Sequence, residues 1–282
     1  MTTAAEFMKK ADGKANALFF KDLDGAYDLY IKAAGVFKAD KDLRGAGKAF
    51  MCAGDMAIRQ KNYGDACSAY ADCAKCLKKV DMPGAKAAME IAIKLNIEAN
   101  RLATAARLLK DWGEALEADS AFDEALAAYK KAMDYFNAED QAQAATACLT
   151  KMASIYVSQD NFHEASKAYE KLGMKAVDGP LKFQAKDSFF RAFICRLALI
   201  SPDNRMEGCA EARDCLDTYL GLDTHFRNTR EAEACELLLV AVDESDEQRF
   251  DEAIGNLNEL RMLDDSKSHI LLKVKQNLTD IR

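Results

Sequence analysis

The amino-acid sequence predicts an all-α protein, a twisted right-handed solenoid of helical hairpins with a C-terminal helical cap. Three observations lead to this prediction. Only three prolines occur in 282 residues, and proline breaks helix interiors because it lacks an amide donor and clashes with the preceding turn. Alanines recur about every twenty residues inside amphipathic segments. One phrase also repeats: in Phe122-Asp-Glu-Ala125-Leu-Ala-Ala-Tyr129, small and aromatic residues share one helical face and charged residues the other.

The repeat extends through most of the chain. The phrase returns over 63–70, 162–169 and, more weakly, 250–257. Polar or helix-breaking residues predict turns at 39–42, 60–62, 81–84, 98–100, 119–120, 138–140 and 159–161. One helix and one turn make each step, so a hairpin repeats about every forty residues, longer than the roughly 34 of a tetratricopeptide repeat but built in the same way. Such hairpins must stack, because none can bury its apolar face alone.

The first helix is expected to end near Lys14, and three large apolar residues follow it: Leu18, Phe19 and Phe20. Connections usually run over the surface, so apolar residues there either tuck back into the core or are exposed for a purpose. The residues by themselves favour tucking.

The pattern changes after Tyr169. A strongly apolar helix is predicted over 185–199, then a break at 201–204 and helices near 209–220, 229–245, 249–263 and 267–280. We therefore expect residues 1–175 to form hairpin repeats, with a short apolar loop near 16–22. Residues 176–282 are expected to form the last repeat helices and a C-terminal helical bundle that closes the stack.

Composition and charge argue against several classes of function. The net charge of -7 disfavours general nucleic-acid binding. No run of about eighteen apolar residues occurs, and the first ten residues lack the apolar core of a signal peptide, so we expect a soluble cytoplasmic protein. The nine cysteines are odd in number and spread through helical patterns, which predicts reduced thiols.

No group of residues has the spacing of a catalytic or metal site. His163, His225 and His269 are far apart in polar settings and are expected at the surface. The CxxC motif at 73–76 has no second pair to complete a zinc site. The segment 45–48 has the Gly-Lys pair of a phosphate loop but not its other residues, so it is predicted to start a helix. We expect no enzyme activity, no metal and no cofactor.

Basic residues form the remaining candidate site. Equivalent positions of successive hairpins line up on one face of a solenoid, so cations that recur with the repeat can form a stripe for an acidic partner. Ordinary solvated helix surface is the alternative for any single residue. The candidates are Lys78, Lys79, Arg101, Arg107, Lys151, Lys182, Lys186 and Arg191.

A longer stretch carries a specific resemblance. It reads Leu172-Gly-Met-Lys-Ala-Val-Asp-Gly-Pro180-Leu-Lys-Phe-Gln-Ala185-Lys-Asp-Ser-Phe-Phe-Arg-Ala-Phe-Ile-Cys195. It resembles the part of alpha-type soluble NSF attachment proteins in which a helix ends, a Pro-Leu turn follows and an Ala-Lys-Asp helix rich in phenylalanine begins. Further segments agree in order and spacing, so the resemblance covers essentially the whole chain: 33–38, 74–79, 148–151, 271–275 and the final Ile281-Arg282.

The resemblance implies a function as well as a fold. Members of this family bind assembled SNARE four-helix bundles, of syntaxin-type and other coiled-coil SNAREs, laterally through a basic concave face. They then recruit the hexameric ATPase NSF, which disassembles the bundle. The implied role is an adaptor in vesicle-mediated transport and membrane fusion, including ER–Golgi transport, that is cytoplasmic and peripherally associated with membranes.

Residue roles follow from the resemblance by position. The basic residues that match the SNARE-facing surface are Lys78, Lys79, Arg101, Arg107 and Lys151. Ala147 stands where the family has a lysine, so one contact is missing or moved. The cations near the apolar helix, Lys182, Lys186 and Arg191, are further candidates for SNARE binding.

The two ends of the chain are expected to serve other partners. Leu18, Phe19 and Phe20 match a loop that dips aromatic residues into the bilayer, which reverses the preference for tucking, although the loop is shorter here. The residues expected to recruit the ATPase are Asp280, Ile281 and Arg282, with Asp243 and Glu244 as candidates for the acidic charge that the family carries near its end.

Two other classes of function remain open. A general peptide-binding adaptor of the tetratricopeptide type predicts tight binding of a short linear peptide. An enzyme predicts turnover that depends on Cys73, Cys76 or a histidine.

Overall fold

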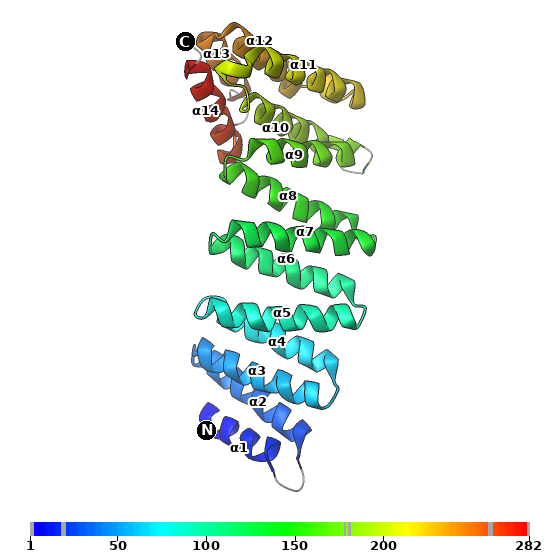
Figure 1. Cartoon of the computed structure of the whole chain (residues 1–282), viewed down its shortest axis with the longest axis vertical. Helices are drawn as coiled ribbons and strands as arrows, with labels where there is room; N and C mark the ends of the chain where they lie inside the picture. Colours follow the sequence, from blue (N-terminus) through cyan, green and yellow to red (C-terminus); the bar gives the residue numbers. More distant parts are fainter. Residues whose placement is uncertain (1–2, 18–20, 178, 180–181, 259–261, 281–282) are drawn as a thin grey trace. The chain divides into compact units, whose positions relative to one another are not determined.

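The structure is a computed structural model that describes residues 3–17, 21–177, 179, 182–258 and 262–280. These residues form α-helices joined by short connections, and no β-strand occurs among them. Figure 1 shows the helices coloured along the chain. The all-α prediction is confirmed.

The chain divides into two compact units, residues 1–145 and residues 146–282. The division falls inside α8 (Ala142–Ser158). The boundary expected near residue 175 stays a prediction.

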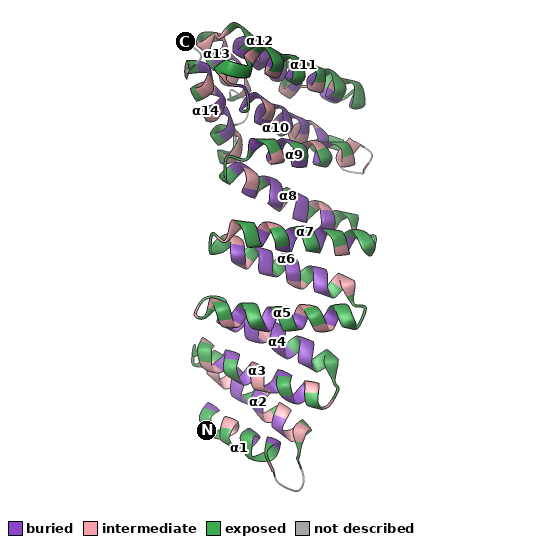
Figure 2. Cartoon of the chain, viewed as in Figure 1, coloured by how far each residue is buried: buried purple, intermediate pink, exposed green. Residues whose placement is uncertain are grey.

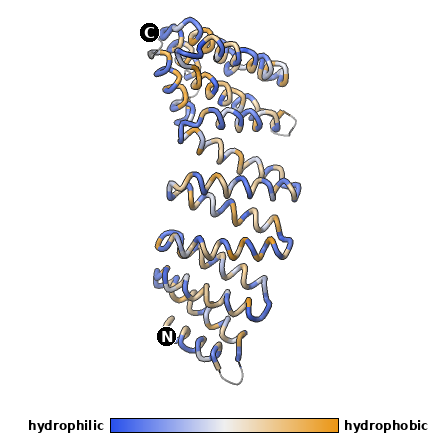
Figure 3. Tube along the Cα trace, in the orientation of Figure 1, coloured by the Kyte–Doolittle hydropathy of each residue, from blue (hydrophilic) through white to orange (hydrophobic). Residues whose placement is uncertain are grey.

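Helices of the first unit stack in chain order, and consecutive helices pack against each other as hairpins. Buried residues follow the faces between neighbouring helices and exposed residues cover the outer faces (Figure 2), an alternation that also appears in the hydropathy of the trace (Figure 3). The helices before α8 are α1 (Ala4–Ala15), α2 (Leu23–Ala39), α3 (Leu43–Arg59), α4 (Tyr63–Leu77), α5 (Met82–Glu98), α6 (Leu102–Ala118) and α7 (Phe122–Ala138).

One backbone design recurs in the connections and maintains the regular helix spacing. Between α2 and α3, Lys41 adopts the left-handed conformation, with φ 61°. The Asp42 N–H donates to the Phe37 carbonyl at 2.8 Å, which closes α2, and the Asp42 carboxylate accepts the Gly45 N–H at 2.8 Å, which opens α3. One residue thus ends one helix and begins the next. Left-handed residues recur at Lys61, Asn100, Ser120, Asp140 and Asp160.

The α4–α5 connection is different. The Leu77 carbonyl accepts the N–H groups of Val80 at 2.8 Å and Asp81 at 2.7 Å. Asp81 then caps α5 by accepting the Gly84 N–H at 3.1 Å. The predicted turn over 81–84 is wrong beyond Asp81, because Pro83 lies in the first turn of α5, where its missing N–H has no helical partner to lose.

Glycines allow the helices of a hairpin to approach closely. Gly54 of α3 faces Tyr70 of α4, and a Cβ on this glycine would lie 2.8 Å from the ring. Gly113 of α6 faces Tyr129 of α7 in the same way, at 2.9 Å. Tyr129 is wholly buried, and its hydroxyl donates to Glu117 Oε2 at 2.8 Å. The small and aromatic residues of the repeated phrase therefore form the core between helices, as predicted.

The second unit is organised around α10. This helix packs against α9, α11, α12 and α14, and its side chains Phe189, Phe190, Phe193 and Ile194 are at most 1% exposed. The α-helices after α8 are α9 (Phe162–Val177), α10 (Ala185–Leu197), α11 (Arg205–Leu222), α12 (Arg230–Glu244), α13 (Glu247–Asn258) and α14 (Asp265–Asp280). Three short 3-10 helices lie between them: η1 (Lys182–Gln184), η2 (Pro202–Asn204) and η3 (Phe226–Asn228).

A charged network joins α10 to the start of α14. Arg191 Nε lies 2.7 Å from Asp187 Oδ2, and Arg191 Nη2 lies 2.5 Å from Asp264 Oδ2. Lys267 contacts both carboxylates, and the guanidinium of Arg191 lies over the ring of Tyr169 in α9. Burial alone would raise the pKa of Asp187, but hydrogen bonds from Arg191 and Lys267 leave it lowered. The network therefore holds α14 on α9 and α10 most firmly when both carboxyl groups are ionised.

All nine cysteines are free thiols. Cys73 and Cys76 are buried in α4, and burial raises the pKa of Cys73 to about 12. Burial also raises the pKa of Cys195 to about 12. These thiols remain protonated at neutral pH and contribute to packing, as predicted.

Candidate functional site

Exposed cations gather on two alternate helices of the first unit. Lys78 caps the C-terminus of α4 and Lys79 follows it, while Arg107 lies in α6. All three are exposed, and among the described residues none of them forms an ion pair. Their neighbours differ: Lys75 is 3.4 Å from Asp72, and Lys110 is 3.7 Å from Glu114. Because α4 and α6 are alternate helices of the stack, they lie in the same layer of it.

Arg101 bridges these two helices. It precedes α6, and its Nη2 donates to the Sγ of Cys67 in α4 at 3.2 Å. Burial raises the pKa of Cys67, so the acceptor is a neutral thiol that leaves the charge of Arg101 unbalanced. Arg101 is exposed overall and adds to the exposed positive charge of these two helices.

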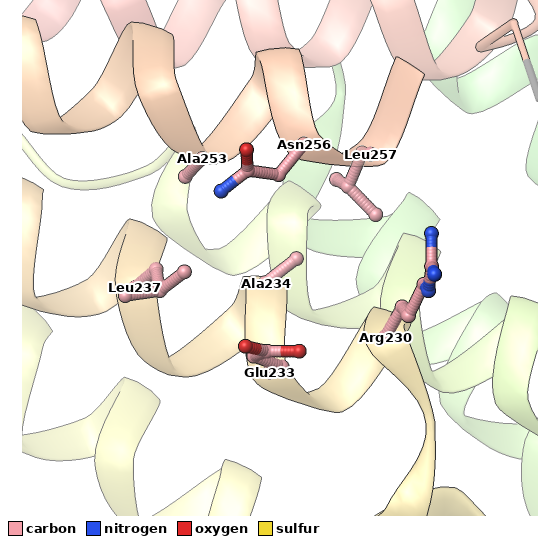
Figure 4. A pocket seen from close by; sticks show the side chains of 7 residues that line it. All are labelled: Arg230, Glu233, Ala234, Leu237, Ala253, Asn256 and Leu257. Atoms are coloured by element: carbon pink, nitrogen blue, oxygen red, sulfur yellow. The ribbon is translucent and has the colours of Figure 1, made fainter. Parts of the chain in front are cut away.

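A cavity of about 240 Å³ lies between α12 and α13 (Figure 4). Its lining mixes polar and apolar side chains: Arg230, Glu233, Ala234, Leu237, Ala253, Asn256 and Leu257. Sites that enclose small molecules usually measure about 300–1,000 Å³. The cavity is smaller, and it points to no small-molecule chemistry.

The histidines lie at the surface, as predicted. His163 and His225 are exposed, and His269 Nε2 lies 2.7 Å from Asp160 Oδ1, where it ties α14 to the α8–α9 turn. In the described part of the chain, no three His, Cys, Asp or Glu side chains are grouped as metal ligands. No helix there is both long enough and apolar enough to cross a membrane.

Comparison with known proteins points to one protein family. The sequence profile described as "Soluble NSF attachment protein, SNAP" matches residues 2–279. The chain belongs to the soluble NSF attachment protein family. Among curated relatives, the alpha-soluble NSF attachment protein of Vitis vinifera is 30% identical over 96% of this chain and 92% of its own length. The protein of the same name from Mus musculus is 28% identical, over 99% of this chain and 94% of its own. Vesicular-fusion protein SEC17 of Komagataella phaffii is 27% identical, over 99% of this chain and 97% of its own length.

Within this member of the attachment-protein family, the other predicted SNARE-facing residues have mixed surroundings. Lys151 is half-buried on α8 in the second unit, and Lys182 is exposed in η1. Lys186 Nζ lies 2.9 Å from Glu231 Oε1. The Arg191 side chain is only 16% exposed and belongs to the network with α14. Lys182 and the predicted cations of the first unit are therefore exposed and without an ion pair among the described residues.

The acidic candidates Asp243 and Glu244 are the last two residues of α12. Asp243 Oδ2 lies 3.8 Å from Arg213 Nη2, and Glu244 pairs with Arg249. Asp280 is the last residue of α14. The predicted membrane-contact residues Leu18, Phe19 and Phe20, and the terminal Ile281 and Arg282, lie outside the described residues.

Sequence reasoning missed the structural role of Arg191. The spacing of Asp187 and Arg191, four residues apart on a helix, was the available signal for an ion pair. Nothing local indicated Asp264 or Lys267, since both come from the start of α14, more than seventy residues further along the chain.

Proposed function

We propose that this chain is an adaptor that binds assembled SNARE four-helix bundles laterally and recruits and stimulates the ATPase NSF, for SNARE disassembly in vesicle trafficking. Family membership over nearly the whole chain supports attachment to NSF and a role in vesicular fusion. The proposed adaptor has no catalytic role of its own and works at the membrane as a peripheral protein.

One observation carries the SNARE part of the proposal. In a chain with a net charge of -7, α4 and α6 present exposed cations that lack carboxylate partners within the described residues. Such charges lose little solvation before binding and attract an acidic surface over a distance. A four-helix bundle with acidic side chains offers a matching surface along its length. A general peptide-binding adaptor is the weaker reading, because the family match extends over both units.

Reversing the charge of this face should weaken SNARE binding. For Arg107→Glu combined with Lys78→Glu, we expect pull-down on a preassembled SNARE bundle to show affinity reduced about tenfold or more, since each reversal replaces attraction by repulsion. The remaining binding should depend less on salt. Titration of the bundle at two ionic strengths measures both effects.

Lys130→Glu combined with Lys131→Glu is the matched control, because both lysines are exposed on α7, a helix of the other set in the stack. It introduces the same charge change and should leave binding nearly unchanged. If the α7 variant loses as much affinity for the bundle as Arg107→Glu combined with Lys78→Glu, the loss is a general effect of charge. Equal binding to the separate SNARE chains would count against lateral docking on an assembled bundle.

Removal of Ile281 and Arg282 should separate the two activities. The apolar tip is expected to contact the ATPase, so stimulation of ATP hydrolysis by NSF should be lost while SNARE binding stays intact. Circular dichroism tests whether α14 is retained. Simultaneous loss of SNARE binding would indicate a folding defect and not loss of the NSF contact.

A further inference from the structure

A second surface combines exposed apolar side chains with free cations, at one edge of the second unit. Phe183 in η1 is 89% exposed. Met174 near the end of α9 is 41% exposed, and Leu222 at the end of α11 is 46% exposed. Single exposed apolar residues are ordinary, but a group of large ones on one edge marks an interaction surface.

Two contacts show that these residues share an edge. Lys186 Nζ, in the first turn of α10, lies 2.9 Å from Glu231 Oε1, in the first turn of α12. The ring centroid of Phe226 in η3 lies 5.8 Å from that of Phe189 in α10. The connection before α10 and the connection before α12 are therefore neighbours. Figure 1 shows the ends of α9 and α11 and the start of α10 on the same side of this unit.

The charge at this edge is positive. Within the described residues, five cations there have no carboxylate at ion-pair distance: Lys171, Lys175, Lys182, Arg227 and Arg230. Glu231 is already matched by Lys186, and the buried Asp223 accepts the His225 N–H at 2.9 Å. Glu233, exposed in the first turn of α12, is another acidic residue at this edge, and Asp178, between Lys175 and Lys182 in the sequence, lies outside the described residues. A positive edge in a chain of net charge -7 is a local feature.

We propose that this edge, formed by Met174, Lys175, Lys182, Phe183, Leu222 and Arg227, docks on an anionic lipid bilayer. An aromatic ring can enter the headgroup region while lysines beside it meet anionic lipid, as their stems snorkel along the apolar boundary. Phe183 projects from a short connection and is 89% exposed, so it suits a deformable bilayer better than a preformed protein pocket. The proposal is independent of the adaptor function and of the segment at 18–20.

The test uses the full chain with Phe19→Ala and Phe20→Ala, so that the amino-terminal segment contributes no aromatic insertion. Binding is measured by co-sedimentation with vesicles of phosphatidylcholine alone and with added phosphatidylserine. On anionic vesicles we expect Phe183→Ala to bind about tenfold more weakly and Lys182→Ala about fivefold more weakly. Higher salt should reduce binding of the parent chain. Neutral vesicles should bind all variants poorly.

Met206→Ala is the matched control, because Met206 is 86% exposed at the start of α11, away from this edge. It should bind like the parent. In a separate variant, Phe183→Trp should show blue-shifted emission when anionic vesicles are added, while the native Trp112 is buried and stays unchanged. The proposal is overturned if Phe183→Ala and Lys182→Ala bind vesicles like the parent. It is also overturned if both lose SNARE-bundle binding but keep vesicle binding.

Discussion

Gly173→Ala is expected to lower the free energy of unfolding of the second unit by about 2 kcal/mol, although alanine usually improves a helical position held by glycine. A Cβ at this position would lie 2.5 Å from the ring of Phe189. That ring is wholly buried and stacks on Tyr219, with 4.7 Å between centroids. Phe226 lies on it as well, so the ring has no free space to move into. The measurement is urea unfolding followed by circular dichroism.

Gly255→Ala is the control within the same unit. Gly255 lies inside α13, and a Cβ there would meet nothing within 4 Å. It should raise stability by about 0.5–1 kcal/mol, because alanine loses less backbone entropy in a helix. Opposite signs for the two variants would show that close helix approach requires Gly173. A neutral or stabilising Gly173→Ala would show that the ring of Phe189 can shift to admit the added methyl group.

Arg191→Met should destabilise the docking of α14 by about 2 kcal/mol. Methionine keeps much of the volume but removes one of the two cations, Arg191 and Lys267, that Asp187 and Asp264 share. Breaking a fully buried pair costs about 3–5 kcal/mol, and the smaller value is expected because both carboxylates remain nearly half exposed. Lys186→Met removes a more exposed pair and should change stability by at most about 1 kcal/mol. Hydrogen exchange of α14 amides distinguishes local release from global unfolding.

The network around Arg191 also contributes stability that is lost at acid pH. Burial opposes ionisation of Asp264, but the Lys267 N–H and Arg191 leave its pKa lowered, as for Asp187. A lowered folded-state pKa stabilises fully above the unfolded value of about 3.9, and this stabilisation is lost as pH falls through the folded pKa. Stability should therefore drop below about pH 4 in the native chain, and less steeply in Arg191→Met. Identical pH profiles would show that the network contributes no ionisation-linked stability.

Much of the fold follows from short-range patterns. The spacing of alanines and aromatics, and polar turns such as 39–42 and 159–161, predict helices and connections close to those observed, because helical periodicity and capping depend on residues only a few positions apart. The turn proposed at 81–84 was wrong because a proline is equally compatible with a turn and with the first turn of a helix. The repeat also made Lys78, Lys79 and Arg107 candidates for a stripe of cations, and the structure shows that all three are exposed.

The sequence by itself thus determined the stacked hairpins, the family and the candidate cations of the first unit. The tertiary structure decided which cations have partners: Arg191 carries the same charge as Arg107, but the fold brings Asp264 to it from the start of α14. It also decided that Phe189 is enclosed while Phe183, six residues earlier, is exposed. The physical reason is that helix formation depends on local backbone geometry, whereas burial and ion pairing depend on segments far apart in the chain that meet only after folding.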